Sequence, residues 1–458
     1  MPEDTSPTPT DDSNANASPS DKSPNRGVLS TILLTVFLDL VGFSIIFPLF
    51  PDMLEYYLGK ETPGGGLHSL VAWLDSISGL EGENARRATE VLFGGLLGSL
   101  YSLLQFVAAP IWGTLSDRRG RRRILTITIA GTAFSYLLWI LADSFWLLVL
   151  SRFVGGIMAG NLSVATAAVA DVTDASNRSK GMGMIGAAFG IGFIFGPVMG
   201  ALLSRWDAPQ WLPWIPGVNP FSGPALVAFL LAVANLYFVV KKFPETLTTG
   251  KHDPTHARRP INPLALLRPS EFQGVNLTNW LYFVFIVAFA GMEFTLTFLA
   301  KDRFGYTSAK NGYLFLFIGI VIAVVQGGLV RRLAPKYGEV RLAIAGLIMI
   351  VPGLIIVALA QPPSEVPLYF GLFLLAAGSS LVTPSLTALV SLYTPTDRQG
   401  ETLGVFRSLG SLGRAFAPIA AALVYWKFGS AWPYFGSAML LLVPIALAWQ
   451  LPTPASRT

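Results

Sequence analysis

Twelve apolar runs of about 20 residues constrain the fold of this chain more than any other feature. A helix of about 20 residues crosses the roughly 30 Å hydrocarbon core of a bilayer. Only 13% of the residues are charged and 52% are hydrophobic, which is unsuited to a soluble fold. The sequence therefore predicts an all-α polytopic membrane protein. The runs begin near Val28, Val91, Ile124, Phe145, Gly181, Pro224, Gly274, Gly312, Leu342, Pro367, Gly400 and Tyr434.

The distribution of positive charge predicts how the chain is oriented. The even-numbered connections between apolar runs hold eighteen Lys and Arg residues, against eight in the odd-numbered ones. An excess of Lys and Arg marks the cytoplasmic side of a membrane. Residues 1–27 are rich in Ser, Thr, Pro, Asp and Asn and predict a disordered tail, with no signal peptide before the first run. We expect a multi-pass protein of the inner or plasma membrane with both termini in the cytoplasm.

The longest polar stretch after the first outer connection divides the chain into two halves. It covers residues 241–273 and separates six runs (28–240) from six others (274–452). Residues 113–131 can be aligned with 328–346, and 195–203 with 416–424, which indicates an internal repeat. The alternative is chance matching among Gly, Ala and Leu. We expect two six-helix bundles around a site at the membrane midplane, an arrangement found in transporters.

The sequence argues against several other classes of function. The absence of cysteine excludes disulfides, iron–sulfur clusters and thiol catalysis. Of the three histidines, His252 and His256 lie in the polar stretch, so we expect neither a metal site nor a cofactor. No cluster of nucleophile and base predicts a catalytic residue. The pI near 9.3 comes from basic loops, and no motif predicts a nucleic-acid partner.

Five charged residues fall well inside the predicted membrane helices. A charge at the bilayer centre costs about 3 kcal/mol on insertion scales, so such residues usually face a wet cavity or a partner. We expect the two acids to couple transport to protons and the three arginines to line a substrate cavity. The helical rise per residue puts Asp39 and Arg152 at similar depths, so the two could pair, and likewise Glu293 and Arg414. The alternative is that such pairs only lock helices together. The five are Asp39, Glu293, Arg152, Arg407 and Arg414.

The seventh apolar run adds aromatic residues to the predicted cavity. Trp280, Tyr282 and Phe289 belong to it, and they favour an amphipathic substrate over a small polar metabolite. With three arginines and two acids, the predicted cavity is net positive. These features together favour an amphipathic organic anion.

A short loop between the second and third apolar runs, GTLSDRRGRRRIL, contains five arginines. It resembles the signature of the major facilitator superfamily at this position. The resemblance implies a cytoplasmic gate, in which Asp117 contacts the start of the eleventh helix and Arg121 links Asp117 to Asp171 at the end of the fourth. The gate residues are Gly113, Asp117, Arg118, Gly120, Arg121 and Asp171.

The fifth apolar run carries a regular series of glycines. Gly192, Gly196 and Gly200 have the small-xxx-small spacing that lets helices approach closely, and Pro197 follows the second of them. This run resembles the GxxxGPxxG signature of drug:proton antiporters. Ordinary helix packing is the alternative explanation.

Longer segments resemble the tetracycline-efflux branch of the superfamily. They include FLDLVGFSIIFPLFP in the first run and SRFVGGIMAGN in the fourth. The stretches VLFGGLLGSLYSLLQFVAAP, GMEFTLTFLAKDRF and FRSLGSLGRAF are most similar to tetracycline transporter-like organic-anion exporters. The ninth run has no acid where bacterial tetracycline exporters have one, so the resemblance does not extend to tetracycline as substrate.

The sequence thus predicts a monomeric proton-coupled exporter that moves amphipathic organic compounds, organic anions or drugs, by alternating access. The lipid bilayer, protons and the amphiphile are its expected partners. A proton-coupled metabolite symporter and a lipid flippase remain alternatives. Lipid translocation by the protein in liposomes without a proton gradient would distinguish the flippase.

Overall fold

The computed structural model describes residues 26–60, 65–78, 83–173, 175–206, 208–211, 214–247, 269–395 and 399–453. Within these ranges all regular secondary structure is helical. The first half contains α1 (Arg26–Ser44), η1 (Phe47–Leu49), α2 (Phe50–Lys60), α3 (Gly66–Ser78), α4 (Glu83–Arg119), α5 (Arg121–Ile140), α6 (Phe145–Met158), α7 (Asn161–Val172), α8 (Ala175–Leu203), α9 (Ala208–Trp211) and α10 (Ser222–Lys242). The second half contains α11 (Val275–Phe304), α12 (Ser308–Val324), the π-helical η4 (Val325–Val330), α13 (Arg331–Tyr337), α14 (Glu339–Leu359), α15 (Val366–Tyr393), α16 (Gln399–Phe428) and α17 (Trp432–Ala448).

The predicted membrane helices are confirmed. In the described residues, 11 helical segments are long and apolar enough to cross a membrane, and α17 is a twelfth, shorter apolar helix. Two helices extend beyond the predicted apolar runs. The first span continues through η1 and α2 to Lys60, because Met53, Leu54 and Tyr57 give α2 a buried apolar face. The helix that contains the second span begins at Glu83, and the membrane-spanning part begins at Gly94, close to the predicted Val91.

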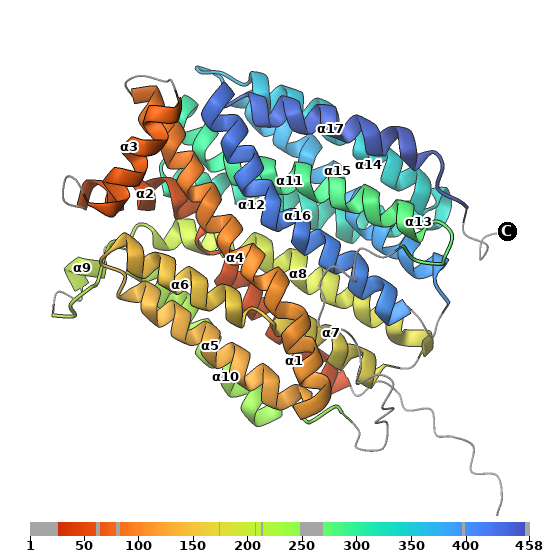
Figure 1. Cartoon of the computed structure of the whole chain (residues 1–458). Coiled ribbons are helices and arrows are strands. Elements are labelled where there is room, and N and C mark those ends of the chain that lie inside the picture. The colour runs from red at the N-terminus through yellow and green to blue at the C-terminus, as the bar shows by residue number, and fades with distance from the viewer. Residues whose placement is uncertain are drawn as a thin grey trace, which may run out of the picture.

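The helices form two stacked groups (Figure 1). The second-half helices α11, α14, α15 and α17 lie above the first-half helices α1, α5, α6 and α10. The helices α4 and α16 run side by side, as do α8 and α12, and these two pairs join the halves. We call the end where α10 ends and α11 begins the linker end, and the end with α2, α3 and α9 the far end.

Helix α8 packs closely on α1 through its glycines. A Cβ on Gly192 would lie 2.8 Å from the carbonyl oxygen of Phe37, and one on Gly200 would overlap the carbonyl oxygen of Ile45. Gly196 faces Ser44, whose hydroxyl donates to the Leu40 carbonyl at 2.7 Å. The glycines of the fifth span therefore create the close approach that their spacing predicts.

Polar side chains join the two halves at the far end. Lys301 at the end of α11 lies 2.7 Å from Glu55 and 3.4 Å from Asp52, both in α2. Asp52 also accepts from the backbone N–H of Ser308, the first residue of α12, at 3.2 Å. In addition, the Ser99 hydroxyl of α4 accepts from the Ile419 N–H of α16 at 3.1 Å. The far end is therefore closed by contacts between halves.

The two halves repeat one turn. Gly120, between α4 and α5, has φ 94° and ψ 144°, and Gly338, between α13 and α14, has φ 83° and ψ 156°. L-residues rarely adopt such positive φ values, so glycine suits both turns. The shared conformation supports an internal repeat, with Gly120 corresponding to Gly338 instead of to Pro335 as in the sequence alignment.

The predicted tail and linker lie mostly outside the described residues. The tail (1–27) enters the structure only at Arg26, where α1 begins. Of the linker (241–273), residues 241–247 and 269–273 are described. Residues 243–247 pack on the first half, since Phe243 is buried and Glu245 contacts the start of α5.

Candidate transport site and gate

Asp39 lies in α1 on the side that faces α7. Its carboxylate accepts a hydrogen bond of 2.7 Å from the Asn161 side-chain amide. Asn161 is the first residue of α7 and is 1% exposed. Asp39 is only partly buried. The acid is therefore held by a neutral amide and not by a cation.

Arg152 does not form the predicted ion pair with Asp39. Among the ion pairs of the described residues, none joins these two side chains. The Arg152 guanidinium lies 4.8 Å from the ring centroid of Trp139 and 6.0 Å from that of Tyr136, both in α5. These are cation–π distances. The alternative of an Asp39–Arg152 pair locking helices together is therefore also wrong in this conformation.

The fourth span is broken near Asp39. Helix α6 ends at Met158 and α7 begins at Asn161. The Trp112 indole N–H of α4 donates to the Ile157 carbonyl at 2.7 Å, which satisfies a carbonyl near the break. A Cβ on Gly160 would lie 2.5 Å from Trp112, so only glycine fits beneath this ring. The sequence analysis missed Trp112, although GGIMAGN gives a signal for a helix break.

In the second half, Glu293 of α11 lies within electrostatic range of Arg414 of α16. Glu293 is partly exposed. Arg407, seven residues before Arg414, lies near Gly186 of α8, and 3.9 Å separates its Nη2 from the position of a Cβ on that glycine. The structure thus brings Glu293 near Arg414 and places Arg407 at the boundary between the halves.

The aromatic residues of α11 do not share one face. Tyr282 is buried and stacks on Phe406 of α16, with ring centroids 3.9 Å apart. Trp280 is 64% exposed and contacts Phe283 edge-on. Residues two apart on a helix do not face each other, so Trp280 and Tyr282 cannot line one cavity wall. Phe289 is partly buried beside Phe285, with centroids 5.7 Å apart.

The gate residues form a network centred on Arg121 at the linker end. The buried Arg121 guanidinium pairs with Asp117, donates through Nε to Asp171 at 2.9 Å and through Nη1 to Ser116 at 2.6 Å. The link from Asp117 through Arg121 to Asp171 is therefore present. Gly113 packs against the Ser163 side chain of α7.

Glu245 completes the network and was missed by the sequence analysis. Its carboxylate accepts from the Arg121 N–H at 2.8 Å and the Arg122 N–H at 3.2 Å, the first amides of α5. A carboxylate suits this position because the first amides of a helix have no partners within it. Any side chain on Gly120 would overlap Glu245. The available signal was an acid that follows the sixth span by a few residues, at the start of a polar segment with more basic than acidic residues.

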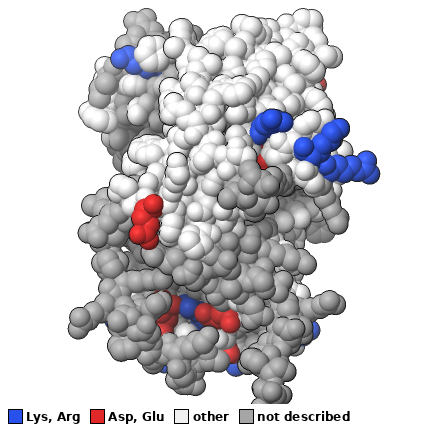
Figure 2. All heavy atoms as spheres, turned by 90° about the vertical axis from the view of Figure 1, so that its right-hand side faces the viewer, with Lys and Arg blue, Asp and Glu red and all other residues white. Residues whose placement is uncertain are grey.

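Charged side chains gather at the linker end (Figure 2). The view onto this end shows acidic and basic groups together in its lower part and basic groups on its upper right. No membrane helix can keep so many charges in hydrocarbon, so this surface belongs in water. Arg118 also lies at this end, in the last turn of α4.

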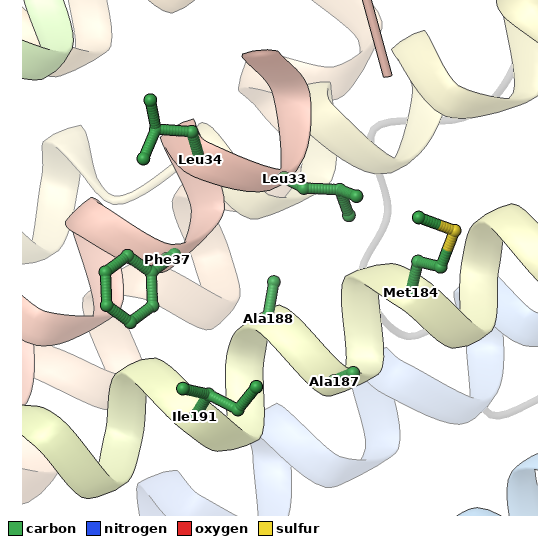
Figure 3. A pocket seen from close by; sticks show the side chains of 7 residues that line it. All are labelled: Leu33, Leu34, Phe37, Met184, Ala187, Ala188 and Ile191. Carbon is green, nitrogen blue, oxygen red and sulfur yellow. The ribbon is translucent and has the colours of Figure 1, made fainter. Parts of the chain in front are cut away.

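An apolar groove of about 420 Å³ lies apart from the charged site (Figure 3). Leu33, Leu34 and Phe37 of α1 face Met184 and Ile191 of α8 across it. None of the charged residues inside the spans lines this groove. Its lining suits hydrocarbon and provides no group for a proton or an anion.

Twelve membrane helices in two halves, with acids and arginines inside the spans, define this protein as a membrane transporter. Comparison with known families supports this class. Residues 32–418 match the Major Facilitator Superfamily, with a second match over 329–458. The chain belongs to this superfamily.

Individual relatives are similar over nearly the whole chain. The mouse Major facilitator superfamily domain-containing protein 10 is 36% identical over 94% of both chains. The crystal structure of the human organic anion transporter MFSD10 (TETRAN) has a TM-score of 0.73 and 33% identity, covering 93% of this chain and 100% of that one. The class B tetracycline resistance protein of Escherichia coli is 26% identical over 86% of this chain and 87% of the relative. These relatives are transporters and not enzymes.

Proposed function

We propose that this protein is a proton-coupled antiporter that exports amphipathic organic anions by alternating access. The observation that carries the proposal is the Asp39 carboxylate at membrane depth, hydrogen-bonded to a neutral amide. An acid tied to a cation would lose much of its tendency to take up a proton, whereas Asp39 keeps it. The test is transport of anionic, cationic and neutral amphiphiles into inverted vesicles energised by a proton gradient.

The substrate class follows from fixed positive charge and from similarity. Arg407 and Arg414 cannot lose their protons at accessible pH and provide donors for a carboxylate or sulfonate. The human relative of known structure is an organic anion transporter. In α14, which is the ninth span, the only acid is the first residue, Glu339; none lies deeper in the helix, which argues against tetracycline. A metabolite symporter or a lipid flippase of the same fold remains the second candidate.

The topology proposal places the linker end in the cytoplasm. Its excess of Lys and Arg supports this orientation, with both termini on the same side of the inner or plasma membrane. The far end is closed by the contacts of Asp52 and Glu55 with Lys301. The protein then faces the cytoplasm, from which an exporter takes its substrate. We propose that it works as a monomer surrounded by lipid.

Arg407→Gln should weaken anion binding about tenfold while changing cation binding little. Hydrogen bonds to a charged group contribute about 1.5–3 kcal/mol, and 1.4 kcal/mol corresponds to a factor of ten. Binding of matched anionic and cationic fluorescent amphiphiles to purified protein measures the effect. Arg407→Lys is the control, since it keeps the charge. Equal losses for both probes in Arg407→Gln would show that Arg407 only holds helices together.

Asp117→Asn should increase the population open at the linker end and slow turnover. We propose that Asp117 contacts the positive end of the α16 dipole when this end closes, a contact of about 1–2 kcal/mol. In the present conformation Asp117 pairs with Arg121 instead. The rate of labelling of Ser408→Cys, a partly exposed position on α16, measures this opening. The label is specific because the chain has no other cysteine.

The matched control for this variant is Asp143→Asn, because Asp143 is an exposed acid that pairs with Lys60 at the far end. It should leave the labelling rate at Ser408→Cys unchanged. An unchanged rate in Asp117→Asn as well would mean that the gate loop serves only to orient the chain in the membrane.

A further inference from the structure

The short helix α7 touches the proton site at one end and the gate network at the other. Asn161 at its start donates to Asp39, and Asp171 in its last turn accepts from Arg121. Asn161 and Asp171 are ten residues apart in the 12-residue α7, a distance of about 15 Å at the helical rise of 1.5 Å per residue. We propose that α7 couples the two sites, with Asn161 as the residue that positions Asp39 and reports its protonation state. The inference rests on the proposed proton coupling.

The buried Asn161 side chain makes a single hydrogen bond among the described residues. Its Nδ2 donates to Asp39, while its Oδ1 is buried without a hydrogen-bond partner among the described residues. A buried amide oxygen without a partner is costly, about 1–3 kcal/mol. The free oxygen has a function here. When the Asp39 carboxyl group is protonated it becomes a hydrogen-bond donor, and this oxygen can then accept its hydrogen bond. Asn161 provides both partners: Nδ2 for the charged carboxylate and Oδ1 for the neutral acid.

The bond changes strength when Asp39 takes up a proton. A hydrogen bond to a charged carboxylate is about twice as strong as one between neutral groups. Protonation therefore loosens the hold of α1 on the start of α7. Tyr101 of α4 and Tyr136 of α5 lie within electrostatic range of Asp39, and neither of these helices carries the Asn161 bond.

The break before α7 lets this helix move separately from α6. Trp112 packs at the break: its indole N–H donates to the Ile157 carbonyl, and its ring occupies the space beside Gly160. The next residue, Gly113, contacts Ser163 in the first turn of α7. The segment of α4 from Trp112 onward thus contacts the start of α7. Arg121 contacts the end of α7 through Asp171. A shift of α7 therefore acts directly on the gate network.

The chain offers a closely matched control for Asn161. Asn235 of α10 is also 1% exposed, also donates to α1 and also has a buried Oδ1 without a partner among the described residues. It donates to the backbone carbonyl of Thr35 at 3.2 Å instead of to a carboxylate. Asn161→Leu and Asn235→Leu each remove a buried side-chain amide. Only the amide of Asn161 is hydrogen-bonded to an acid.

The experiment measures substrate flux against pH in proteoliposomes and, separately, labelling of Ser163→Cys at acid and neutral pH. A donor favours the charged carboxylate, so Asn161→Leu should shift the half-maximum of the pH profile upward by about one unit. It should also remove the pH dependence of labelling. Asn235→Leu should change neither. Equal behaviour of the two variants, or an unshifted profile in Asn161→Leu, would overturn the inference.

Two further readouts separate this inference from the proposed function. If the flux through the wild-type protein does not depend on the pH gradient, proton coupling is refuted. If the labelling rate of Ser163→Cys does not depend on pH, the role of α7 is refuted. Should Asn161→Leu not fold, Trp112→Phe keeps the ring over Gly160 and removes the bond to Ile157. It should speed labelling at both pH values and reduce their difference. Unchanged labelling in Trp112→Phe would contradict the coupling.

Discussion

Asp39→Asn should abolish pH-driven transport while leaving the protein folded and able to bind its substrate. An amide has nearly the size of the carboxyl group and still accepts a hydrogen bond from Asn161, but it does not titrate. Flux driven by an imposed pH gradient should fall to background in proteoliposomes. Exchange of labelled for unlabelled substrate, which needs no net proton movement, should persist and provides the control.

Glu293→Gln tests the second acid in the same assays. Glu293 lies near the fixed positive charge of Arg414, so the two acids need not carry the proton equally. Loss of driven flux in one variant alone identifies the coupling acid. Wild-type driven flux in both variants would refute proton coupling through these residues and leave both acids with structural roles.

Gly200→Ala should destabilise the protein by about 2 kcal/mol or more. The added Cβ would overlap the backbone carbonyl of Ile45 in α1, and backbone cannot move aside without separating the two helices. Overpacking of a well-packed contact costs about 1–3 kcal/mol. Gly190→Ala on the same helix is the control, since a Cβ there has nothing within 4 Å.

Thermal unfolding in detergent, followed by the intrinsic fluorescence of the tryptophans, measures both glycine variants. We expect a clear loss of thermal stability for Gly200→Ala and little change or a small gain for Gly190→Ala. If Gly200→Ala melted like the wild type, the close approach of α1 and α8 would not be needed for stability.

The sequence was sufficient to predict the membrane helices and the glycine contacts. Apolar length and the rise per residue determine position along the membrane normal. They do not determine the direction in which a side chain points around its helix. Arg152 illustrates this limit, because its predicted depth matches that of Asp39 but it faces the rings of Trp139 and Tyr136.

Contacts between distant segments account for the rest of what was missed. Glu245 and Trp112 carry no motif of their own, and each acts on backbone that belongs to another part of the chain. Trp280 and Tyr282 share a helix and a chemical type, yet helix rotation exposes one and buries the other. Residue type predicted the chemistry of the site, whereas packing decided which residues take part.

The two ends of the molecule differ in how far dissolved ions can reach their charges. At the far end the side chains of Asp52 and Glu55 are 35% and 59% exposed, and the Debye length in physiological salt is about 8 Å. At the linker end the Arg121 side chain is only 6% exposed. Rising ionic strength therefore weakens the far-end contacts more than the Arg121 network. The balance between conformations depends in this way on the salt content of the fluid that bathes the far end.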